Sequence, residues 1–313
     1  MNKLRIGSRK SRLAMLQCEM VRKQLFDIGI ETEIVGITTV GDSDLKNPLY
    51  KTKSTGIFVT EIEEYLRNKK IDIAVHSLKD LTDINSNGLV VSAILRRENP
   101  VDVFVSKKYS SLEMVKSGDV VGTSSARRIS ELMSLRKDLK IKNIRGNIET
   151  RIKKICSGEY DCGIMAFAGI KRLGLLSEVK EILSLKDFTP VRGQGMIAVE
   201  TRKSDEELNK ILKEIDDSQT RKCFNVELAF SNIVSGGCSS PVGVCCISEN
   251  GSYTIYAYIG DIKGEMFIKR SIVKDDVSDE DGIRLANEIL ESGGREILEK
   301  IRKEKSDTYN HIQ

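Results

Sequence analysis

Short apolar runs alternate with amphipathic stretches along the first two thirds of the chain. Residues 4–7, 33–39 and 71–76 have the β-branched, apolar character of strands. The stretches 11–27 and 58–68 repeat apolar residues at helical spacing. The run 71–76 is almost continuously apolar, which predicts a central strand buried on both faces. This alternation is typical of βα units arranged around a parallel sheet.

The same alternation begins again near residue 100. The pattern predicts strands over 101–106, 119–122, 141–144 and 162–166, with helices over 125–136 and 147–156. The segments 96–100 and 189–193 have the composition of connectors. They would join one α/β lobe to a second lobe and return, and two lobes joined in this way would have a cleft between them.

The last hundred residues have a different pattern. A helix over 218–233 leads into a glycine-rich loop, and three strands follow over 242–248, 253–260 and 265–274. Asn250-Gly251 is a strong hairpin signal and Lys263-Gly264 a weaker one. Two helices close the chain. We therefore predict a first lobe over 1–96 and 197–215, a second lobe over 101–190, and a C-terminal α+β domain with a three-stranded antiparallel sheet over 218–313.

Composition narrows the class of protein. With 313 residues, 40% of them hydrophobic and 31% charged, the chain can bury a core without disulfide or metal staples. The net charge of +4 is too small to indicate nucleic-acid binding by bulk charge. No apolar run approaches 18 residues and the amino terminus lacks the apolar core of a signal peptide, so we expect a cytoplasmic protein without membrane contact.

Cysteine and histidine usage argues against a metal site. The seven cysteines form no CxxC pair, and the only histidines are His76 and His311. We expect reduced thiols and no bound metal.

Arginines recur where predicted strands meet predicted helices. Beside them stand residues that can cap a helix, such as Ser11, Ser125 and Asn147. Ligands of open α/β sheets bind at the carboxyl ends of the strands, where helix amino termini attract anions. A guanidinium binds a carboxylate through two hydrogen bonds, so this edge suits a ligand with many carboxylates. The arginines are Arg9, Arg127, Arg128, Arg145, Arg151 and Arg172. Any one of them could instead be a solvated charge at a helix end.

A second candidate is the segment that ends the buried strand over 71–76. Ser77, Lys79 and Asp80 follow it directly. The Asp80 carboxylate could stabilise a developing cation or accept N–H donors in an arginine-rich cleft. Alternatively, Asp80 caps a helix or pairs with Lys79. His76 lies among apolar residues, which favours a core histidine over a catalytic one.

Two glycine-containing segments need separate interpretation. Cys238 stands in the loop Gly236-Gly237-Cys238, where glycines permit a sharp turn and leave a thiol accessible. The run 193–198 matches the spacing GxGxxA, but it follows Thr189-Pro190 and precedes a strand-like segment instead of opening a helix. We therefore do not expect a nucleotide site there.

Together these segments resemble the porphobilinogen deaminase (hydroxymethylbilane synthase) family. The matching runs, in order, are IGSRKSRLAMLQ, GIFVTEIE, DIAVHSLKD, GTSSARR, RGNIETR, AFAGIKRLG, RGQG and GGCSSPVG. The resemblance implies two α/β lobes of the periplasmic-binding-protein type (type II) and a C-terminal domain that carries a cysteine. It implies a transferase that condenses four porphobilinogen molecules head to tail, with loss of ammonia, onto a covalently bound dipyrromethane primer. Hydrolysis then releases hydroxymethylbilane, a precursor in haem and tetrapyrrole biosynthesis.

The resemblance also implies roles for individual residues. Asp80 would be the catalytic aspartate, and Cys238 would hold dipyrromethane through a thioether. The residues that would hold the cofactor are Ser77, Lys79, Asp80, Thr123, Ser125, Arg127, Arg128, Asn147 and Arg151. Those that would hold the incoming substrate are Arg9, Ser11, Gln17, Arg145, Arg151, Arg172 and Gln194. The resemblance implies a monomer whose partner is porphobilinogen, and movement of the lobes and of the loop 41–55.

Some positions depart from the family pattern. Thr55 stands where the family usually has lysine, while Lys51 matches and Lys53 could substitute. Arg12, Thr82 and Arg192 replace residues usual in the family. Two other classes stay open: a two-lobed carboxylate-binding protein without catalysis, and a nucleic-acid binder. Low net charge and few aromatic residues disfavour the nucleic-acid binder.

Overall fold

The computed structural model describes residues 3–39, 59–81, 84, 87–234 and 240–310. Contacts divide the chain into two compact units. Unit 1 comprises Met1–Asn99, Lys171–Gly174 and Gly193–Arg221, and unit 2 comprises Pro100–Ile170, Leu175–Arg192 and Lys222–Gln313. The finer division into three domains stays a prediction.

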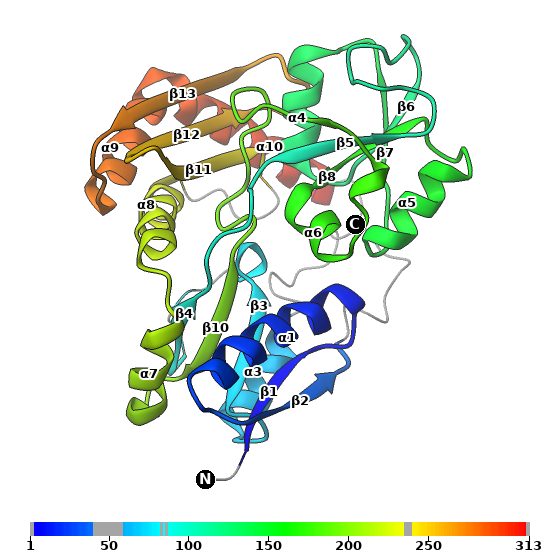
Figure 1. Cartoon of the computed structure of the whole chain (residues 1–313). Helices are drawn as coiled ribbons and strands as arrows, with labels where there is room; N and C mark the ends of the chain where they lie inside the picture. Colours follow the sequence, from blue (N-terminus) through cyan, green and yellow to red (C-terminus); the bar gives the residue numbers. More distant parts are fainter. Residues whose placement is uncertain (1–2, 40–58, 82–83, 85–86, 235–239, 311–313) are drawn as a thin grey trace. The chain divides into compact units, whose positions relative to one another are not determined.

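A five-stranded sheet forms the centre of unit 1, in the order β2-β1-β3-β10-β4 (Figure 1). Its strands are β2 (Thr32–Ile37), β1 (Leu4–Arg9), β3 (Ile73–Ser77), β10 (Ile197–Arg202) and β4 (Leu89–Ile94). β1 is parallel to β2 and β3, whereas β10 is antiparallel to β3 and β4. The helices of this unit are α1 (Arg12–Asp27), α3 (Thr60–Arg67) and α7 (Glu206–Leu212), with 3-10 turns at Leu78–Asp80 and Lys213–Ile215.

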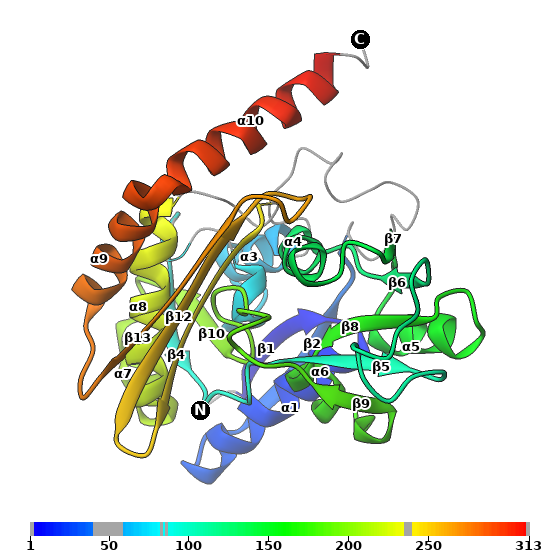
Figure 2. The ribbon, with the colours of Figure 1, turned by 90° about the horizontal axis from the view of Figure 1, so that it is seen from above.

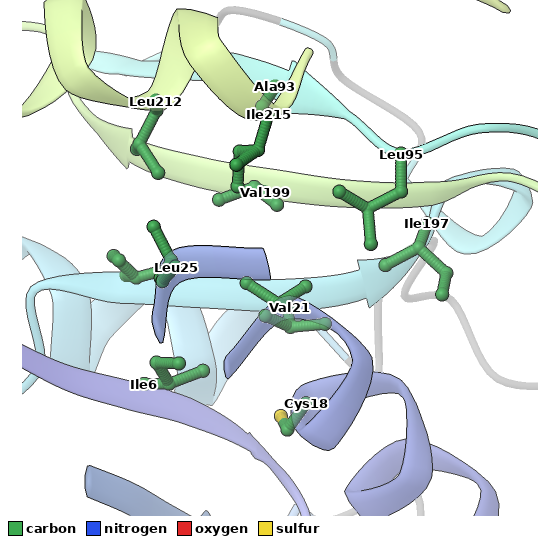
Figure 3. Close-up of a cluster of buried hydrophobic side chains, with 12 residues drawn as sticks. Ile6, Cys18, Val21, Leu25, Ala93, Leu95, Ile197, Val199, Leu212 and Ile215 are labelled. Carbon is green, nitrogen blue, oxygen red and sulfur yellow. The ribbon is translucent and has the colours of Figure 1, made fainter. Parts of the chain in front are cut away.

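Buried side chains fasten α1 to this sheet. Val21 and Leu25 of α1 lie in one cluster with Ile6 of β1 and Val199 of β10, and all four are fully or almost fully buried (Figure 3). Cys18 joins the same cluster, where burial raises the pKa of its thiol to about 12. This packing fixes the amino-terminal end of α1 at the carboxyl end of β1.

Unit 2 contains a second five-stranded sheet, in the order β7-β6-β8-β5-β9. Its strands are β7 (Lys140–Lys142), β6 (Val120–Gly122), β8 (Cys162–Ala166), β5 (Asp102–Ser106) and β9 (Val179–Ile182). Here β5 is the antiparallel strand, while β6 is parallel to β7 and β8. The associated helices are α4 (Ala126–Leu135), α5 (Ile148–Cys156) and α6 (Phe167–Arg172), and a 3-10 turn lies at Leu176–Glu178.

The rest of unit 2 is a three-stranded antiparallel sheet with helices. The strands β11 (Val242–Glu249), β12 (Ser252–Gly260) and β13 (Phe267–Lys274) pair in that order. Asn250 and Gly251 both have positive φ, as a tight hairpin turn requires. Figure 2 shows α8 (Ser218–Val234) and α9 (Asp279–Ile289) alongside this sheet, and α10 (Arg295–Asn310) follows a π-helical segment, Leu290–Gly294.

Hydrogen bonds attach the three-stranded sheet to the rest of unit 2. The Ser130 hydroxyl of α4 lies 2.6 Å from the Tyr258 hydroxyl of β12. The Val244 amide of β11 donates to the Pro190 carbonyl at 2.8 Å. A Cβ on Gly243 would lie 2.5 Å from the Thr189 carbonyl oxygen and 3.2 Å from Cδ of Arg127. The sheet therefore packs directly on α4 and on the segment around Pro190.

The predicted fold class is confirmed, with one correction to the sheets. Two α/β lobes, each with a five-stranded sheet, and a C-terminal three-stranded antiparallel sheet are present. Neither five-stranded sheet is wholly parallel, because β10 and β5 enter after a crossover and run against their neighbours. The sequence pattern did not predict β4 or β9, and it placed β7 two residues too far along the chain at its end. No helix in the described ranges is long and apolar enough to cross a membrane.

Two neighbouring residues of α1 test the importance of the core contact. Leu25 is fully buried, whereas the adjacent Phe26 is 68% exposed. We expect Leu25→Ala to lower the free energy of unfolding by about 2–5 kcal/mol, because it leaves a cavity in a close-packed cluster. Phe26→Ala should change it by less than about 0.5 kcal/mol. Urea unfolding of both variants measures the difference, and equal effects would contradict the assignment of this core.

Candidate functional site

The predicted site residues of unit 1 gather where β1 and β3 end. Arg9 is the last residue of β1, and the Ser11 side chain caps α1 by accepting from the Ala14 amide at 3.4 Å. β1 and β3 are parallel neighbours, so their carboxyl ends lie at the same edge of the sheet. The 3-10 turn that holds Lys79 and Asp80 follows β3 directly. The backbone therefore places Arg9, Lys79 and Asp80 at one edge of the sheet, as the sequence predicted.

Gln17 holds the end of β3 from the side of α1. Its side chain is buried, and its Nε2 lies 2.9 Å from Oγ of Ser77. An amide buried against a hydroxyl fixes the orientation of both groups, because leaving either one unpaired would be costly. Gln17 thus connects α1 with the turn that carries Asp80.

The glycine-rich turn at 193–196 packs against the same 3-10 turn. The Leu78 amide donates to the Met196 carbonyl at 3.1 Å. Gly193 has φ +71°, and a Cβ there would lie 3.1 Å from the Lys79 amide nitrogen. Glycine is needed because the backbone takes a left-handed conformation in a tight contact. The turn brings the buried Gln194 close to Lys79. The turn is followed by strand β10, whereas a nucleotide fingerprint would open a helix.

Arg172 is a cation held in a poorly solvated position in unit 1. It is the last residue of α6, and its Nη2 donates to the Gly195 carbonyl at 2.6 Å. Its Nε is buried and has no hydrogen-bond acceptor among the described residues. Burial lowers the pKa of Arg172 to about 10, with Glu98 opposing the shift. A bound carboxylate would compensate this charge.

Asp80 is exposed at the end of its 3-10 turn. Ser77 occupies the N-cap position of this turn and Asp80 is its last residue, so Asp80 does not cap the 3-10 turn itself. The alternative that Asp80 pairs with Lys79 stays a prediction. An exposed carboxylate on a fixed turn can accept hydrogen bonds from an incoming ligand.

His76 lies in the core, as the sequence favoured. It is buried in β3, with its Nε2 3.3 Å from Oε2 of Glu200 on β10. Both side chains are almost completely inaccessible to solvent. A direct contact with substrate is therefore not open to His76.

The predicted site residues of unit 2 gather where α4 and α5 begin. The Ser125 side chain caps α4 by accepting from the Arg128 amide at 3.5 Å, and the Asn147 side chain caps α5 by accepting from the Thr150 amide at 2.8 Å. Thr123 is buried, and its hydroxyl accepts from the Ser125 amide at 3.3 Å. The helices follow the parallel neighbours β6 and β7, so both amino termini lie at one edge.

Three arginines of unit 2 form a cationic cluster at this edge. Arg151 donates from Nε to the Gly146 carbonyl at 2.7 Å. Burial, together with the positive charges of Arg128 and Arg145, lowers the pKa of Arg151 to about 10. No carboxylate among the described residues opposes this shift. The cluster is therefore an electropositive site that an anionic ligand would stabilise.

Arg127 and Arg128 are in addition parts of a buried ion-pair network. Nε and Nη2 of Arg128 donate to the two carboxylate oxygens of Asp102, at 3.0 and 2.7 Å. Nη2 of Arg127 donates to Asp102 at 2.7 Å, and Nη1 of Arg127 donates to Glu131 at 2.8 Å. The Glu131 carboxylate also accepts from the Thr189 amide at 2.6 Å. All four charged side chains are buried.

The charges of this network shift one another's titration. The two arginines hold the pKa of Asp102 well below its usual range despite complete burial. Asp102 and Glu131 raise the pKa of Arg127 further. Glu131 has one arginine partner, and burial, with a contribution from Asp102, raises its pKa to about 7. Asp102 is thus the most firmly ionised carboxylate of the group.

Sequence reasoning missed Asp102 and Glu131. Asp102 was hidden inside the strand Val101-Asp102-Val103-Phe104-Val105, although an acidic residue in an apolar run is a signal that a buried cation lies near. Glu131 stands four residues after Arg127, the spacing of an ion pair along a helix. Both signals were present in the chain.

Several predicted positions lie outside the described residues. They are Cys238 and its glycine loop, the loop 41–55 with Lys51, Lys53 and Thr55, and Thr82. The predicted roles of all candidate residues, described or not, stay predictions at this point.

The described residues define an α/β protein with two five-stranded sheets and a three-stranded antiparallel sheet, in which arginines stand at strand–helix junctions. Comparison with known families gives the particular one. The model for "Porphobilinogen deaminase, dipyromethane cofactor binding domain" matches residues 4–210, and that for "Porphobilinogen deaminase, C-terminal domain" matches residues 221–291. The chain belongs to the porphobilinogen deaminase family. The predicted family and its dipyrromethane cofactor are thereby confirmed.

Curated relatives agree over almost the whole length. The porphobilinogen deaminase of Chloroherpeton thalassium is 38% identical over 304 residues, covering 95% of this chain and 97% of that protein. That of Oceanobacillus iheyensis is 39% identical over 307 residues, covering 97% and 99%. Among solved structures, a putative methionine-binding lipoprotein of Bacillus subtilis is 16% identical with a TM-score of 0.44, over 70% of this chain and 92% of that one.

Two arginines of the cluster should have opposite effects on stability. We expect Arg151→Met to leave the ligand-free protein as stable as wild type or more so, because it removes a partly buried cation that no carboxylate of the described residues compensates. Arg128→Met should destabilise it by about 3–5 kcal/mol, since it removes one partner of a buried ion pair. Denaturant unfolding measures both. Lys153→Met, at an exposed position of α5, is the control. A large destabilisation by Arg151→Met would contradict the description of the cluster.

Proposed function

We propose that this chain catalyses the stepwise head-to-tail condensation of four porphobilinogen molecules onto a dipyrromethane primer, with loss of one ammonia per molecule. Hydrolysis then releases hydroxymethylbilane. The observation that carries the proposal is the cluster of Arg128, Arg145 and Arg151, in which no carboxylate of the described part of the chain opposes the positive charge on Arg151. A substrate whose rings each bear an acetate and a propionate supplies the missing anions.

The donor set of unit 2 fits a dipyrromethane. Its four carboxylates suit the guanidinium groups of Arg128 and Arg151, and the capped amino termini of α4 and α5 favour further anions. Together with Lys79, Thr123, Ser125 and Asn147, these residues would hold the primer, and Cys238 would bind it through a thioether. When bound, the primer supplies the free pyrrole α-carbon to which the first substrate ring is joined.

Asp80 would act on the reacting pyrroles. Loss of ammonia from the aminomethyl group of porphobilinogen leaves a positively charged methylene-pyrrole. A carboxylate that accepts the pyrrole N–H stabilises this charge where it develops. Asp80 suits the role because it is exposed on a turn whose backbone is held by Met196, and because Gln17 fixes the preceding Ser77.

The incoming ring would be held by the remaining cations. Arg9 and Ser11 stand at the end of β1, and Arg172 is a partly buried cation beside the turn that contains Gln194. By the family resemblance, Arg145 would also bind the substrate. Binding through the substrate's carboxylates leaves its aminomethyl group free to react, and it orients the ring for attack.

We further propose that the enzyme works as a monomer in the cytoplasm. In support, the described cysteines are all free, including Cys156, which is only partly buried. Free thiols are typical of reducing compartments. The substrate and the released tetrapyrrole are both small polar molecules.

Intact mass spectrometry tests the covalent tether. Protein purified from a host that makes porphobilinogen should exceed the chain mass by two pyrrole units. We expect Cys238→Ser to remain folded and to have the bare chain mass, because the thioether cannot form. Cys156→Ser, which removes another free thiol, should keep the added mass. A bare chain mass for the wild-type protein would count strongly against the proposed function.

Ammonia release tests the role of Asp80. We expect Asp80→Ala to release ammonia from porphobilinogen at least about 100-fold more slowly than wild type, as is usual when a group that stabilises developing charge is removed. Asp27→Ala, at the exposed end of α1, should be unaffected. Release by Asp80→Ala at a rate near that of wild type would reject the role of Asp80, and the absence of release by the wild type would favour a binding protein without catalysis.

A further inference from the structure

The Asp102 carboxylate forms the centre of the buried ion-pair network in unit 2. It is the first residue of β5 and is fully buried. It accepts three guanidinium hydrogen bonds, two from Arg128 and one from Arg127, at 2.7–3.0 Å. Arg128 is bound bidentately, the geometry that fixes the plane of a guanidinium most strictly.

The two arginines differ in what they can still bind. Arg127 is 4% exposed, it donates to Asp102 and Glu131, and its Nε is buried without a hydrogen-bond acceptor among the described residues. Arg128 donates one hydrogen bond from each nitrogen, to Asp102 and to the Ile164 carbonyl, which leaves two of its five N–H groups. The positive charge of Arg128 also contributes to the lowered pKa of Arg151. Arg128 therefore retains N–H groups for a ligand and is coupled to the cationic cluster, whereas both terminal nitrogens of Arg127 donate within the network.

Arg128 needs such a partner to stay in place. Arg145 and Arg151 repel it, and an arginine side chain has many rotamers through which it could move away from like charge. A carboxylate on an interior strand, itself held by a second arginine, provides a fixed attachment for Arg128. Glu131 and the Thr189 amide complete the network by holding Arg127.

We propose that Asp102 is a positioning residue that orients Arg128 toward the carboxylates of the primer, and that Arg127 supports Asp102 without binding the ligand itself. The proposal rests on the function proposed above. It assigns roles to Asp102 and Arg127 that follow from their contacts alone.

Asp102 could affect anion binding in two ways, through its own negative charge or by holding Arg128 in place, and the two predict opposite effects of the same variant. Its negative charge weakens the positive field of the cluster, so if only the field mattered, Asp102→Asn would bind an anion more tightly. If Asp102 holds Arg128 in place, the same variant binds an anion more weakly. Asp102→Glu separates the two further, because it keeps the charge and moves the carboxylate by one methylene group.

The experiment uses the full chain in two forms. Each variant is first purified from a host that makes porphobilinogen, and intact mass gives the fraction that carries the two pyrrole units. Each is then combined with Cys238→Ser, and calorimetry measures the affinity for benzene-1,2,4,5-tetracarboxylate, a planar probe with four carboxylates. Asp261→Asn is the control, because Asp261 is an equally buried aspartate of unit 2 that pairs with Lys300 instead of an arginine.

We expect Asp102→Asn and Asp102→Glu to bind the probe about 10-fold more weakly and to carry less primer. A change of this size in affinity corresponds to the loss of about one charge-assisted hydrogen bond between Arg128 and the probe. Asp261→Asn should match wild type within about 2-fold. In an Arg128→Met background, Asp102→Asn should cause no further loss, because the effect passes through Arg128. Unchanged or tighter binding by folded Asp102→Asn or Asp102→Glu overturns the proposal.

The outcomes also separate this proposal from the proposed function. Wild-type protein without the added pyrrole mass rejects the function, while the probe titration still tests Asp102. Wild-type protein that carries the primer, together with an equally loaded Asp102→Asn, rejects the role of Asp102 alone. If one of the two Asp102 variants does not fold, the other alone still tests the role of Asp102.

Discussion

Positive charges that must stay close together are the constraint on which this site depends. Arg128, Arg145 and Arg151 repel one another, and their approach is unfavourable until an anionic ligand arrives. The fold meets this constraint by fixing the cations before binding. Arg128 is held by Asp102, and Arg151 by the Gly146 carbonyl. A site prepared in this way gains affinity because little side-chain freedom is lost when the ligand binds.

Local signals in the sequence predicted most of the elements that carry the site. The caps Ser11, Ser125 and Asn147 stand where helices begin, because each side chain bonds an amide only three residues away. The rule that parallel strands end at one edge placed Arg9 near the turn of Asp80. Such predictions need only neighbours in sequence and the direction of the strands.

Contacts between residues far apart in the sequence could not be predicted from local patterns, for physical reasons. The partners of Asp102 are 25 and 26 residues away, and no local pattern states which of several arginines a buried carboxylate meets. The antiparallel direction of β10 and β5 also depends on how the crossovers return, which apolar periodicity does not encode. The same periodicity left β4 and β9 unpredicted, and it gave no means to place Cys238 relative to the arginines.

The close approach of Gly243 to the charged network restricts how domains of this family can be exchanged. Its α-carbon sits so near the Thr189 carbonyl and Arg127 that even a methyl group would push the strand away. A chimaera that takes its C-terminal domain from a relative must therefore keep glycine at position 243. It must also keep the backbone around Thr189 in the conformation that allows this close contact.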